Sequence, residues 1–338
     1  MVISVDSMEK TTTWWHHAAV MAAYAGTYTI LREASFTHWV LTAGLRVTCL
    51  MFVPPRFWPA LIAGETLAMS VQLHSIYVRY GLVFALLCSI SHYFIYIPVV
   101  TFVRRKLSFL DVHGNIHIFP VLISALLCAV LGATMTRLSI TTVVMADGSQ
   151  GMPLLLSSWL ESILGYYLGI LTITPCFIAV RDRISLVRDP FTWKNIRQGS
   201  LRRDIIFFEL PIVVAMLLGS VYIGGDSLPY FRALMLLPVV VLSLRHGWHG
   251  AAIGGMLASL PLTITKIDFR DPSVIPAQAL LALAISTWLL WAFRKTPGIQ
   301  PPMPPAPQTG ITFFLNPLRL FSSNAILGRI DPSRHRNK

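Results

Sequence analysis

Two charged residues stand inside apolar stretches of the chain, where a charge is expensive and is a functional candidate by default. Arg46 precedes the turn 54–59 and Glu65 follows it, at similar distances along the sequence. A helical hairpin around this turn would place the two side chains together, and an ion pair lowers the cost of burying either charge. Two interpretations stay open: the pair is structural, or Arg46 binds an anionic ligand through two parallel guanidinium hydrogen bonds.

Two further carboxylates lie close to the ends of apolar stretches. Glu161 is a candidate ligand-binding residue, whereas Glu209 precedes Pro211 and is interpreted as a residue of the membrane interface. No Walker A, GxSxG, HExxH or nucleotide-cyclase pattern occurs in the sequence. Because such patterns supply the groups that hold phosphates, nucleophiles and catalytic metals, we expect no catalytic residue and no cofactor.

The histidines do not predict a metal site. His113 and His117 are four residues apart and would share a helix face, as metal ligands do. They lie at the junction between a loop and an apolar stretch, beside basic residues, so we interpret them as a solvated interface pair. His38, His74 and His92 carry no functional signal. We therefore expect no bound metal.

The composition identifies the class of protein that must position these residues. Hydrophobic residues make up 54% of the 338 residues, charged residues only 12%, and the mean hydropathy is +0.64. A typical soluble domain carries about 25% charged residues. Segments that span a membrane must be helices or closed barrels, and the apolar runs here are too continuous for alternating barrel strands. We predict an all-α, polytopic membrane bundle.

Apolar stretches of membrane-spanning length recur along the chain. The pattern predicts eight to ten transmembrane helices. Ten is the preferred count, and a re-entrant second and third stretch is the alternative that gives eight. The predicted spans are 16–31, 38–53, 57–73, 80–103, 116–136, 153–180, 205–223, 231–244, 248–265 and 275–293.

Basic residues orient these spans, because positively charged loops stay in the cytoplasm. With ten spans, most of the 27 lysine and arginine residues fall on the side that holds both termini, including those at 104–106 and 181–203. The sequence therefore predicts that both termini are cytoplasmic. The net charge of +12 then reflects topology and contact with anionic lipid. A nucleic-acid partner is not expected, since no basic folded domain is predicted.

The sequence divides into three parts. Residues 1–15 form a predicted cytoplasmic N-terminus, and residues 16–293 form the transmembrane domain, with a basic cytoplasmic loop at 181–204. Residues 294–338 form a proline-rich, basic cytoplasmic tail. This composition favours extended polyproline II, and we predict a disordered tail rather than an enzyme domain.

Three passages resemble one known family. They are an apolar stretch with a basic-aromatic-Trp-Pro turn (44–60), a Leu-Gly-Tyr-Tyr-Leu-Gly helix ending in proline (164–175), and a Leu-Pro stretch with an Arg-His-Gly-Trp-His-Gly-Ala-Ala turn (237–252). The motif residues are Trp58, Pro59, Gly165, Gly169, Pro175, Pro238, Arg245, Gly247 and Gly250. The passages are similar to the bacterial membrane-associated sensor family of the first class (the MASE type). Its members are polytopic input domains of histidine kinases, diguanylate cyclases and cyclic-di-GMP phosphodiesterases.

The chain departs from the family pattern in two places. Tyr166 occupies the position of the family's intramembrane aspartate, and Leu41-Thr42 replaces a Pro-Pro pair before the first glycine. The resemblance places Tyr166 among the candidate ligand-binding residues, together with Arg46, Glu65 and Glu161. Glu161 could supply a displaced carboxylate. The tail shows no kinase, GGDEF or EAL module of the kind that follows the family's last span.

The resemblance implies a non-enzymatic sensor in the bacterial inner membrane. A ligand or a change in the bilayer would alter helix packing, and a separate cytoplasmic histidine kinase, cyclase or regulator would receive the signal. A homodimer is a further expectation. Two alternatives stay open: a small-solute transporter or channel, which buried charges and Gly/Pro-interrupted helices also fit, and a truncated remnant of a sensor kinase or cyclase. A membrane-embedded enzyme ranks last, because the polar residues do not cluster at one leaflet.

Overall fold

The structure is a computed structural model of the whole chain, in which residues 14–35, 39–107, 117–145, 148–151, 153, 155–186, 200–222, 234, 236–264 and 274–294 are described. The predicted N-terminal segment up to residue 13, most of the basic loop and the tail from residue 295 lie outside these residues. His38 and His113 also lie outside them. The described helices belong to one compact unit of the chain.

The described residues are almost entirely helical, as expected for apolar segments that must satisfy their backbone groups internally. A short 3-10 turn, η2 (Pro55–Phe57), separates α2 from α3, and a π-helical turn, η3 (Ile205–Glu209), joins α9 to α10. The helices are α1 (Trp14–Glu33), α2 (Leu41–Phe52), α3 (Trp58–Tyr80), α4 (Leu82–Ser89), α5 (Tyr93–Lys106), α6 (Ile118–Ile140), α7 (Leu156–Leu186), α9 (Ser200–Asp204), α10 (Leu210–Tyr222), α12 (Leu236–Ile264) and α13 (Val274–Arg294).

Three helical segments in the described ranges are long and apolar enough to cross a membrane: Leu82–Lys106, Ile118–Ile140 and Leu156–Arg181. Shorter apolar helices accompany them at Leu41–Phe52, Ile205–Gly219 and Ala279–Trp291. The predicted class, an all-helical membrane protein, agrees with these segments. The predicted count of ten spans is not confirmed by them.

The segment α12 contains a reversal of the chain at Gly247. This residue has φ 62° and ψ −142°, a backbone conformation that glycine adopts without steric cost. A Cβ on Gly250 would collide with the backbone carbonyl of Leu242, although eight residues of straight helix would hold the two apart. The chain therefore folds back at Gly247. This reversal agrees with the predicted boundary between the spans 231–244 and 248–265.

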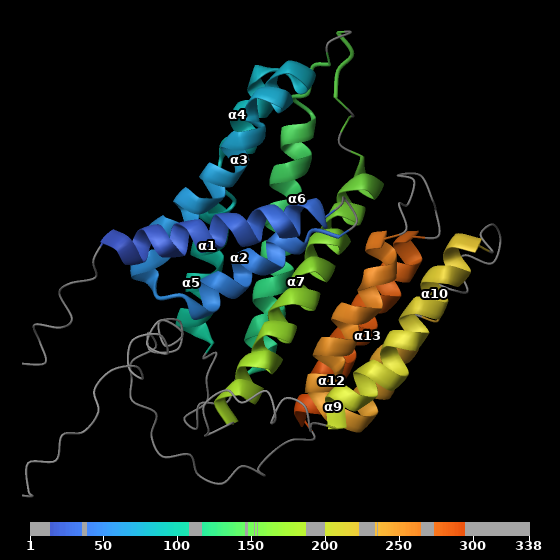
Figure 1. Cartoon of the computed structure of the whole chain (residues 1–338). Coiled ribbons are helices and arrows are strands. Elements are labelled where there is room, and N and C mark those ends of the chain that lie inside the picture. Colours follow the sequence, from blue (N-terminus) through green and yellow to red (C-terminus); the bar gives the residue numbers. More distant parts are fainter. Residues whose placement is uncertain are drawn as a thin grey trace, which may run out of the picture. The chain divides into compact units, whose positions relative to one another are not determined.

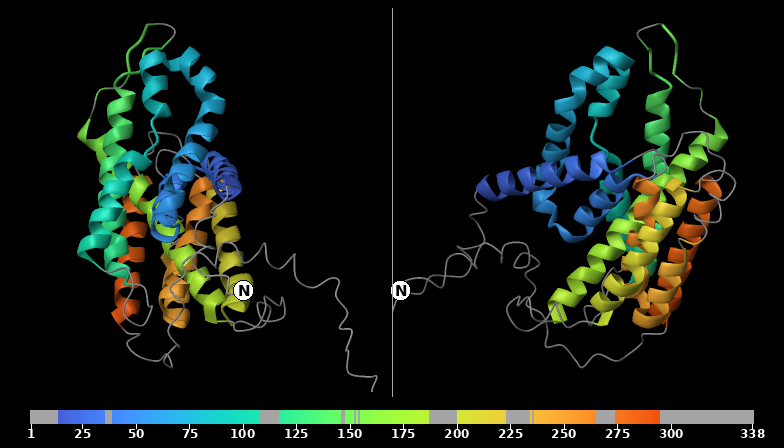
Figure 2. Two further views of the ribbon diagram at one scale, coloured as in Figure 1. Left: turned by 90° about the vertical axis from the view of Figure 1, so that its left-hand side faces the viewer. Right: turned by 45° about the vertical axis from the view of Figure 1, so that its right-hand side comes forward.

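The first helix, α1, lies across the long axes of α6 and α7 (Figure 1 and the right view of Figure 2). It packs against α3, where Gly64 approaches the backbone carbonyl of Met21 and the ring of Tyr24. We had predicted a span at 16–31, but α1 is not among the described helices with the apolarity and length of a membrane span. Its buried residues are two tyrosines, Tyr24 and Tyr28, which polar groups of α2 and α3 bind.

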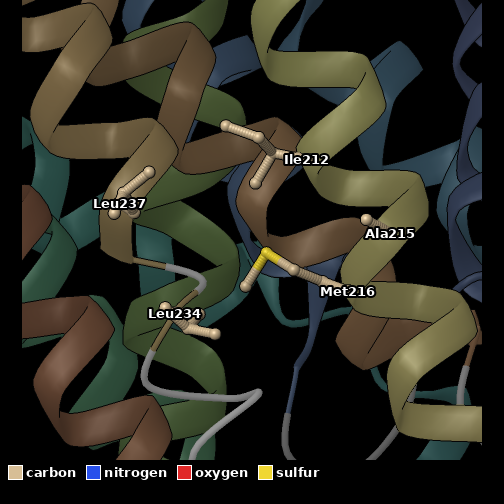
Figure 3. A pocket seen from close by; sticks show the side chains of 5 residues that line it. All are labelled: Ile212, Ala215, Met216, Leu234 and Leu237. Atoms are coloured by element: carbon tan, nitrogen blue, oxygen red, sulfur yellow. The ribbon is translucent and has the colours of Figure 1, made fainter.

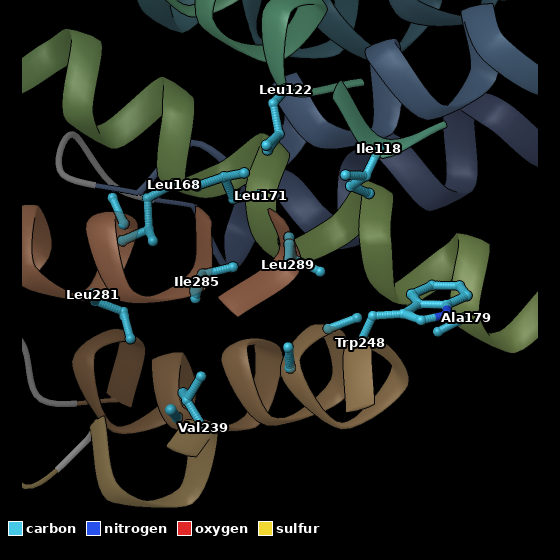
Figure 4. Close-up of a cluster of buried hydrophobic side chains, with 14 of the residues drawn as sticks. Ile118, Leu122, Leu168, Leu171, Ala179, Val239, Trp248, Leu281, Ile285 and Leu289 are labelled. Atoms are coloured by element: carbon cyan, nitrogen blue, oxygen red, sulfur yellow. The ribbon is translucent and has the colours of Figure 1, made fainter. Parts of the chain in front are cut away.

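Two apolar cores share the helix α7. The first core joins α7 to α6, α12 and α13, and Figure 4 shows its side chains converging between these helices. The second core joins α7 to α1, α2, α5 and α6. Fully buried side chains of α7 enter both cores, Leu168 and Ile178 in the first and Ile170 in the second. A movement of α7 would therefore disturb both halves of the bundle.

Glycines of two motif passages bring α2 and α7 into backbone contact. A Cβ on Gly44 would collide with the carbonyl oxygen of Gly169, and a Cβ on Gly169 would collide with the carbonyl oxygen of Val40. The backbone N–H of Val40 donates to the carbonyl of Gly165 over 3.0 Å. Small residues permit such close approach between membrane helices. Thr48 and Thr174 add a hydrogen bond of 3.0 Å between the same helices.

We predict that Gly169→Ala destabilises the protein by about 1–3 kcal/mol, because the added methyl group forces the backbones of α2 and α7 apart. Thermal unfolding in detergent, followed by tryptophan fluorescence, measures the loss. Gly26→Ala is the matched control, since a Cβ at Gly26 meets open space on an exposed face of α1. Equal unfolding temperatures for the two variants would contradict the close contact.

Candidate functional site

The predicted ion pair between Arg46 and Glu65 is present. Arg46 Nε donates to Glu65 Oε2 over 3.0 Å, and Nη2 donates to Oε1 over 3.2 Å. The two residues are only 2% and 1% exposed. The turn η2 creates the hairpin that brings α2 and α3 together, and the indole N–H of Trp58 closes it by donating to the carbonyl of Val53. The pair is thus bidentate and shielded from solvent.

Tyrosines from two helices surround the guanidinium. The hydroxyl of Tyr28 on α1 accepts a hydrogen bond of 3.2 Å from Arg46 Nη2, and the hydroxyl of Tyr24 donates to Glu65 Oε2 over 3.3 Å. The Arg46 guanidinium carbon lies 5.4 Å from the ring centroid of Tyr28 and 6.0 Å from that of Tyr96 on α5. Aromatic faces stabilise a cation at these distances.

His92 belongs to this cluster, although we found no functional signal for it in the sequence. Its backbone N–H donates to Glu65 Oε1 over 3.2 Å, and its ring nitrogen Nε2 lies 3.4 Å from Thr136 Oγ1 on α6. The residue stands in the break between α4 and α5, so its N–H has no helical partner and is free to bind the carboxylate. The break thus supplies a backbone donor that side-chain spacing does not reveal.

Tyr166 completes the cluster from α7. Its hydroxyl lies 2.6 Å from Thr136 Oγ1, and its ring stacks near that of His92, with centroids 6.4 Å apart. Three of the four candidate ligand residues, Arg46, Glu65 and Tyr166, therefore lie in one cluster. Side chains and backbone from α1, α2, α3, α5, α6 and α7, together with the break before α5, form its walls.

Glu161 lies elsewhere. It is five residues, about one and a half turns, before Tyr166 on α7, and its negative charge favours the charged form of Arg137 on α6. Arg137 donates from Nε to Ser162 Oγ over 2.6 Å and is only 9% exposed. The predicted span 116–136 stops one residue before Arg137, whereas the structure places Arg137 inside the last turn of α6. The structure thus forms a second polar group near the end of α6 and does not place Glu161 as a substitute carboxylate beside Arg46.

Among the buried donors that have no hydrogen-bond partner in the described part of the chain, two lie at the guanidinium. They are Arg46 Nη1 and the hydroxyl of Tyr96. Leaving a buried polar group unpaired costs about 1–3 kcal/mol, and more for a charged group. Both are hydrogen-bond donors, so an oxygen atom of a ligand or a water molecule would satisfy them. The arrangement can bind an acceptor, but it contains no nucleophile paired with a base.

The tyrosine cluster was missed by sequence reasoning, yet its spacing carried a signal. Tyr24 and Tyr28 are four residues apart, and Tyr93 and Tyr96 are three apart, so each pair lies on one helix face. Tyrosine hydroxyls need partners when buried, and four of them on two helices indicate a buried polar group nearby. Arg46 and Glu65 were recognised from the sequence because intramembrane charge is the stronger signal, and Tyr166 was recognised from the family resemblance.

The other motif residues shape turns and helix contacts. Trp58 and Pro59 begin α3, and Pro175 lies within α7. Pro238 is in the first turn of α12. A cavity of about 230 Å³ between α10 and the start of α12 is lined only by apolar side chains, namely Ile212, Ala215, Met216, Leu234 and Leu237 (Figure 3). The ion pair contributes nothing to this cavity. Within the described ranges, no group of three or more His, Cys, Asp or Glu side chains could hold a metal ion.

Arg245, the last charged motif residue, binds the end of α9. Its Nη1 lies 3.2 Å from Asp204 Oδ2, and His246 Nε2 lies 3.0 Å from the same oxygen. The hydrogen bonds from His246 and then from Arg245 hold the pKa of the Asp204 carboxyl below its ordinary value. The contact ties the segment after the basic loop to the Gly247 turn of α12.

The fold and the cluster together define a helical membrane protein with a closed, buried polar centre. Comparison with known families identifies it further: residues 17–293 match the MASE1 family, and the chain belongs to that family. MASE1 is a family of membrane sensory input domains. No curated protein and no solved structure matches the chain.

We predict that Arg46 and Glu65 are strongly coupled. Glu65→Gln or Arg46→Met alone should each cost about 3–5 kcal/mol, because each leaves one buried charge uncompensated. The double variant should lose much less than the sum of the two single losses, since it removes both charges. Chemical unfolding in detergent provides the double-mutant cycle. Additive losses would show that the two side chains do not act as a pair.

The Asp204 contact predicts a pH dependence. Because its pKa is lowered in the folded protein, the stabilisation is present above the unfolded value of about 3.9 and is lost as the pH falls through the folded value. Asp204→Asn should therefore lower the unfolding temperature at neutral pH and have no effect in strong acid. An effect of the same size at both pH values would argue against an ionic contact.

Proposed function

We propose that this chain is a non-enzymatic receiver, in which a rearrangement at the Arg46–Glu65 cluster is passed through α7 to α13 and then to a separate signalling protein. One observation carries the proposal. The adjacent residues Tyr166 and Tyr167 on α7 point to different partners: Tyr166 binds Thr136 in the polar cluster, and the Tyr167 hydroxyl lies 3.1 Å from Ser286 Oγ on α13. Consecutive residues thus connect the buried charges to the last described helix.

The closed cluster has the energetics that a two-state receiver needs. Its unpaired donors, Arg46 Nη1 and the Tyr96 hydroxyl, destabilise the closed packing. A ligand or water molecule with an acceptor oxygen binds best to a helix packing in which it can contact these donors. Its binding therefore increases the population of that packing. The ligand class that fits is therefore one that presents an oxygen acceptor to a guanidinium and a phenol. A change in bilayer packing would act on the same equilibrium.

The proposed orientation places the end of α2 in the cytoplasm. Two arginines from other helices gather there: Arg104 Nη1 donates to the carbonyl of Leu50 over 3.4 Å, and the Arg181 guanidinium lies 5.0 Å from the ring centroid of Phe52. A concentration of basic residues is typical of the cytoplasmic side. In a bacterium this membrane is the inner membrane. This orientation supports a signal that leaves through α13 toward a cytoplasmic partner.

The proposed route has a direct test in the purified protein. Tyr166→Phe breaks the contact with Thr136 and should raise hydrogen exchange in α13 around Ser286 by about fivefold, the lower end of typical allosteric coupling. In Tyr166→Phe/Tyr167→Phe the exchange of α13 should equal that of Tyr167→Phe alone, because the connecting hydroxyl is absent. Tyr80→Phe, at the Gly81 turn, is the matched control. Unchanged exchange in Tyr166→Phe would contradict the route.

The partner is tested in intact membranes. An input domain acts only through an output module, so we expect crosslinking of the full chain to recover a histidine kinase, a cyclase or a regulator. Failure to recover any signalling protein, together with normal signalling in a deletion strain, would reject a sensory role. Reconstitution into proteoliposomes tests the alternative function of a transporter. Solute uptake that is abolished in Arg46→Ala would show that the protein is a transporter and not a receiver.

A further inference from the structure

Glu209 is a second carboxylate buried within the helical bundle. It is 0% exposed, and neither of its carboxylate oxygens has a hydrogen-bond partner among the described residues. We had interpreted it as a residue of the membrane interface, and within the bundle its side chain is completely buried. The cluster around Arg46 does not use it. An intramembrane ionisable residue is a candidate functional site.

The local backbone explains why this carboxylate points inward. Glu209 ends the π-helical turn η3, in which the N–H of Leu210 donates to the carbonyl of Ile205. Pro211 has no N–H and therefore cannot make the helical bond to Phe207, so the helix widens before it. The wide turn changes the direction of Glu209 relative to a regular helix, and Glu209, Val213 and Met216 form the buried face of this segment. Single π-helical turns are frequent at functional sites.

Two of the cationic side chains on the segments around Glu209, Arg245 and His246, are held by another carboxylate. The segments packed against η3 are α9, α10 and α12, and α12 carries Arg245, His246 and His249 while α9 carries Arg203 and Asp204. Asp204 binds both Arg245 and His246. Arg245 also lies over the ring of Phe208. No ion pair joins Glu209 to any described residue.

We propose that Glu209 is a proton-binding site, occupied by a proton in the folded protein. An isolated carboxylate in an apolar environment costs far more free energy than a neutral acid, so such a group takes up a proton instead of remaining charged. Glu65 provides the contrast. It is equally buried, but a bidentate contact with Arg46 keeps it ionised. The two carboxylates therefore differ in what neutralises them, a fixed arginine for Glu65 and an exchangeable proton for Glu209.

The position of Glu209 in the bundle suggests how a proton would reach it and what losing the proton would change. Asp204 immediately precedes η3, and His246 of α12 binds it; both side chains are partly exposed and would relay a proton between Glu209 and solvent. Loss of the proton leaves a second carboxylate on this segment, which competes with Asp204 for Arg245 and His246. Proton binding at Glu209 thus favours the packing of α10 against α12 that the structure contains.

A hydrophobic carbodiimide tests the proposal directly. Dicyclohexylcarbodiimide takes the proton of a neutral carboxyl group on one of its nitrogens, and the carboxylate oxygen bonds to its central carbon. Transfer of the acyl group to nitrogen then gives a stable N-acylurea, which contains every atom of both reactants. Mass spectrometry of the full chain in detergent should show at least about tenfold more modification at Glu209 than at Glu65, the ratio that one unit of difference in proton affinity produces. The modification should fall as the pH rises.

Three controls make the outcome decisive. A water-soluble cationic carbodiimide should leave Glu209 unmodified, because the residue is buried. In denatured chain, both glutamates should react equally. Glu209→Gln should remove the modification of that peptide while the unfolding temperature is retained at neutral pH. Equal modification of Glu209 and Glu65 in folded protein would overturn the proposal. Protection of Glu209 by sodium ions at constant pH would also overturn it, since a metal cation would then be the occupant.

Discussion

The permanent charge of Arg46 is the constraint on which the first half of the bundle depends. A guanidinium does not lose its proton in a protein, so its burial requires a carboxylate and further acceptors. Glu65 supplies the carboxylate, and this forces α2 and α3 to meet at a fixed register. The remaining partners, Tyr28 and the ring of Tyr96, must come from other helices. The requirement for these partners determines where α1 and α5 pack against α2.

The helix α7 carries that constraint to the rest of the molecule. Its glycines meet the backbone of α2, its Tyr166 reaches the polar cluster, and its opposite face enters the core shared with α12 and α13. Backbone contact leaves little freedom for sliding, because no flexible side chain separates the two helices. Thr172 accepts a hydrogen bond from Trp39, and Thr174 accepts one from Thr48. These bonds fix the orientation of α7 relative to α2 and the residues just before it. Packed interfaces of this kind change between discrete arrangements rather than deforming gradually, which suits an element that reports on a distant cluster.

The sequence predicted those features whose cause lies in local spacing. The Arg46–Glu65 pair follows from two charges at similar distances from one turn, and the reversal at Gly247 follows from a glycine between two apolar stretches. Features that depend on which helices meet were not predictable. His92 binds Glu65 through its backbone, which no residue type reveals. The inward direction of Glu209 accompanies a π-helical turn before Pro211, and regular helical periodicity does not predict such a turn. The predicted count of ten spans is not confirmed, and α1, which lies across the bundle, lacks the apolarity of the segments that could cross a membrane.

The two fully buried glutamates show how one fold can hold both a fixed and an exchangeable charge. Glu65 is neutralised by a group that never loses its proton, so its contribution is the same at every physiological pH and its role is to define geometry. Glu209 has no such partner in the described residues, and Arg245 and His246 of α12 are bound to Asp204. Its neutral state therefore depends on a proton that solvent can supply or remove. A stable ion pair keeps the same geometry when the pH changes. An unpaired acid gains or loses its proton when the pH changes, and the helix packing around it then changes. The separation of the two groups, one in each half of the bundle, allows the geometry to stay fixed in one half while the other responds.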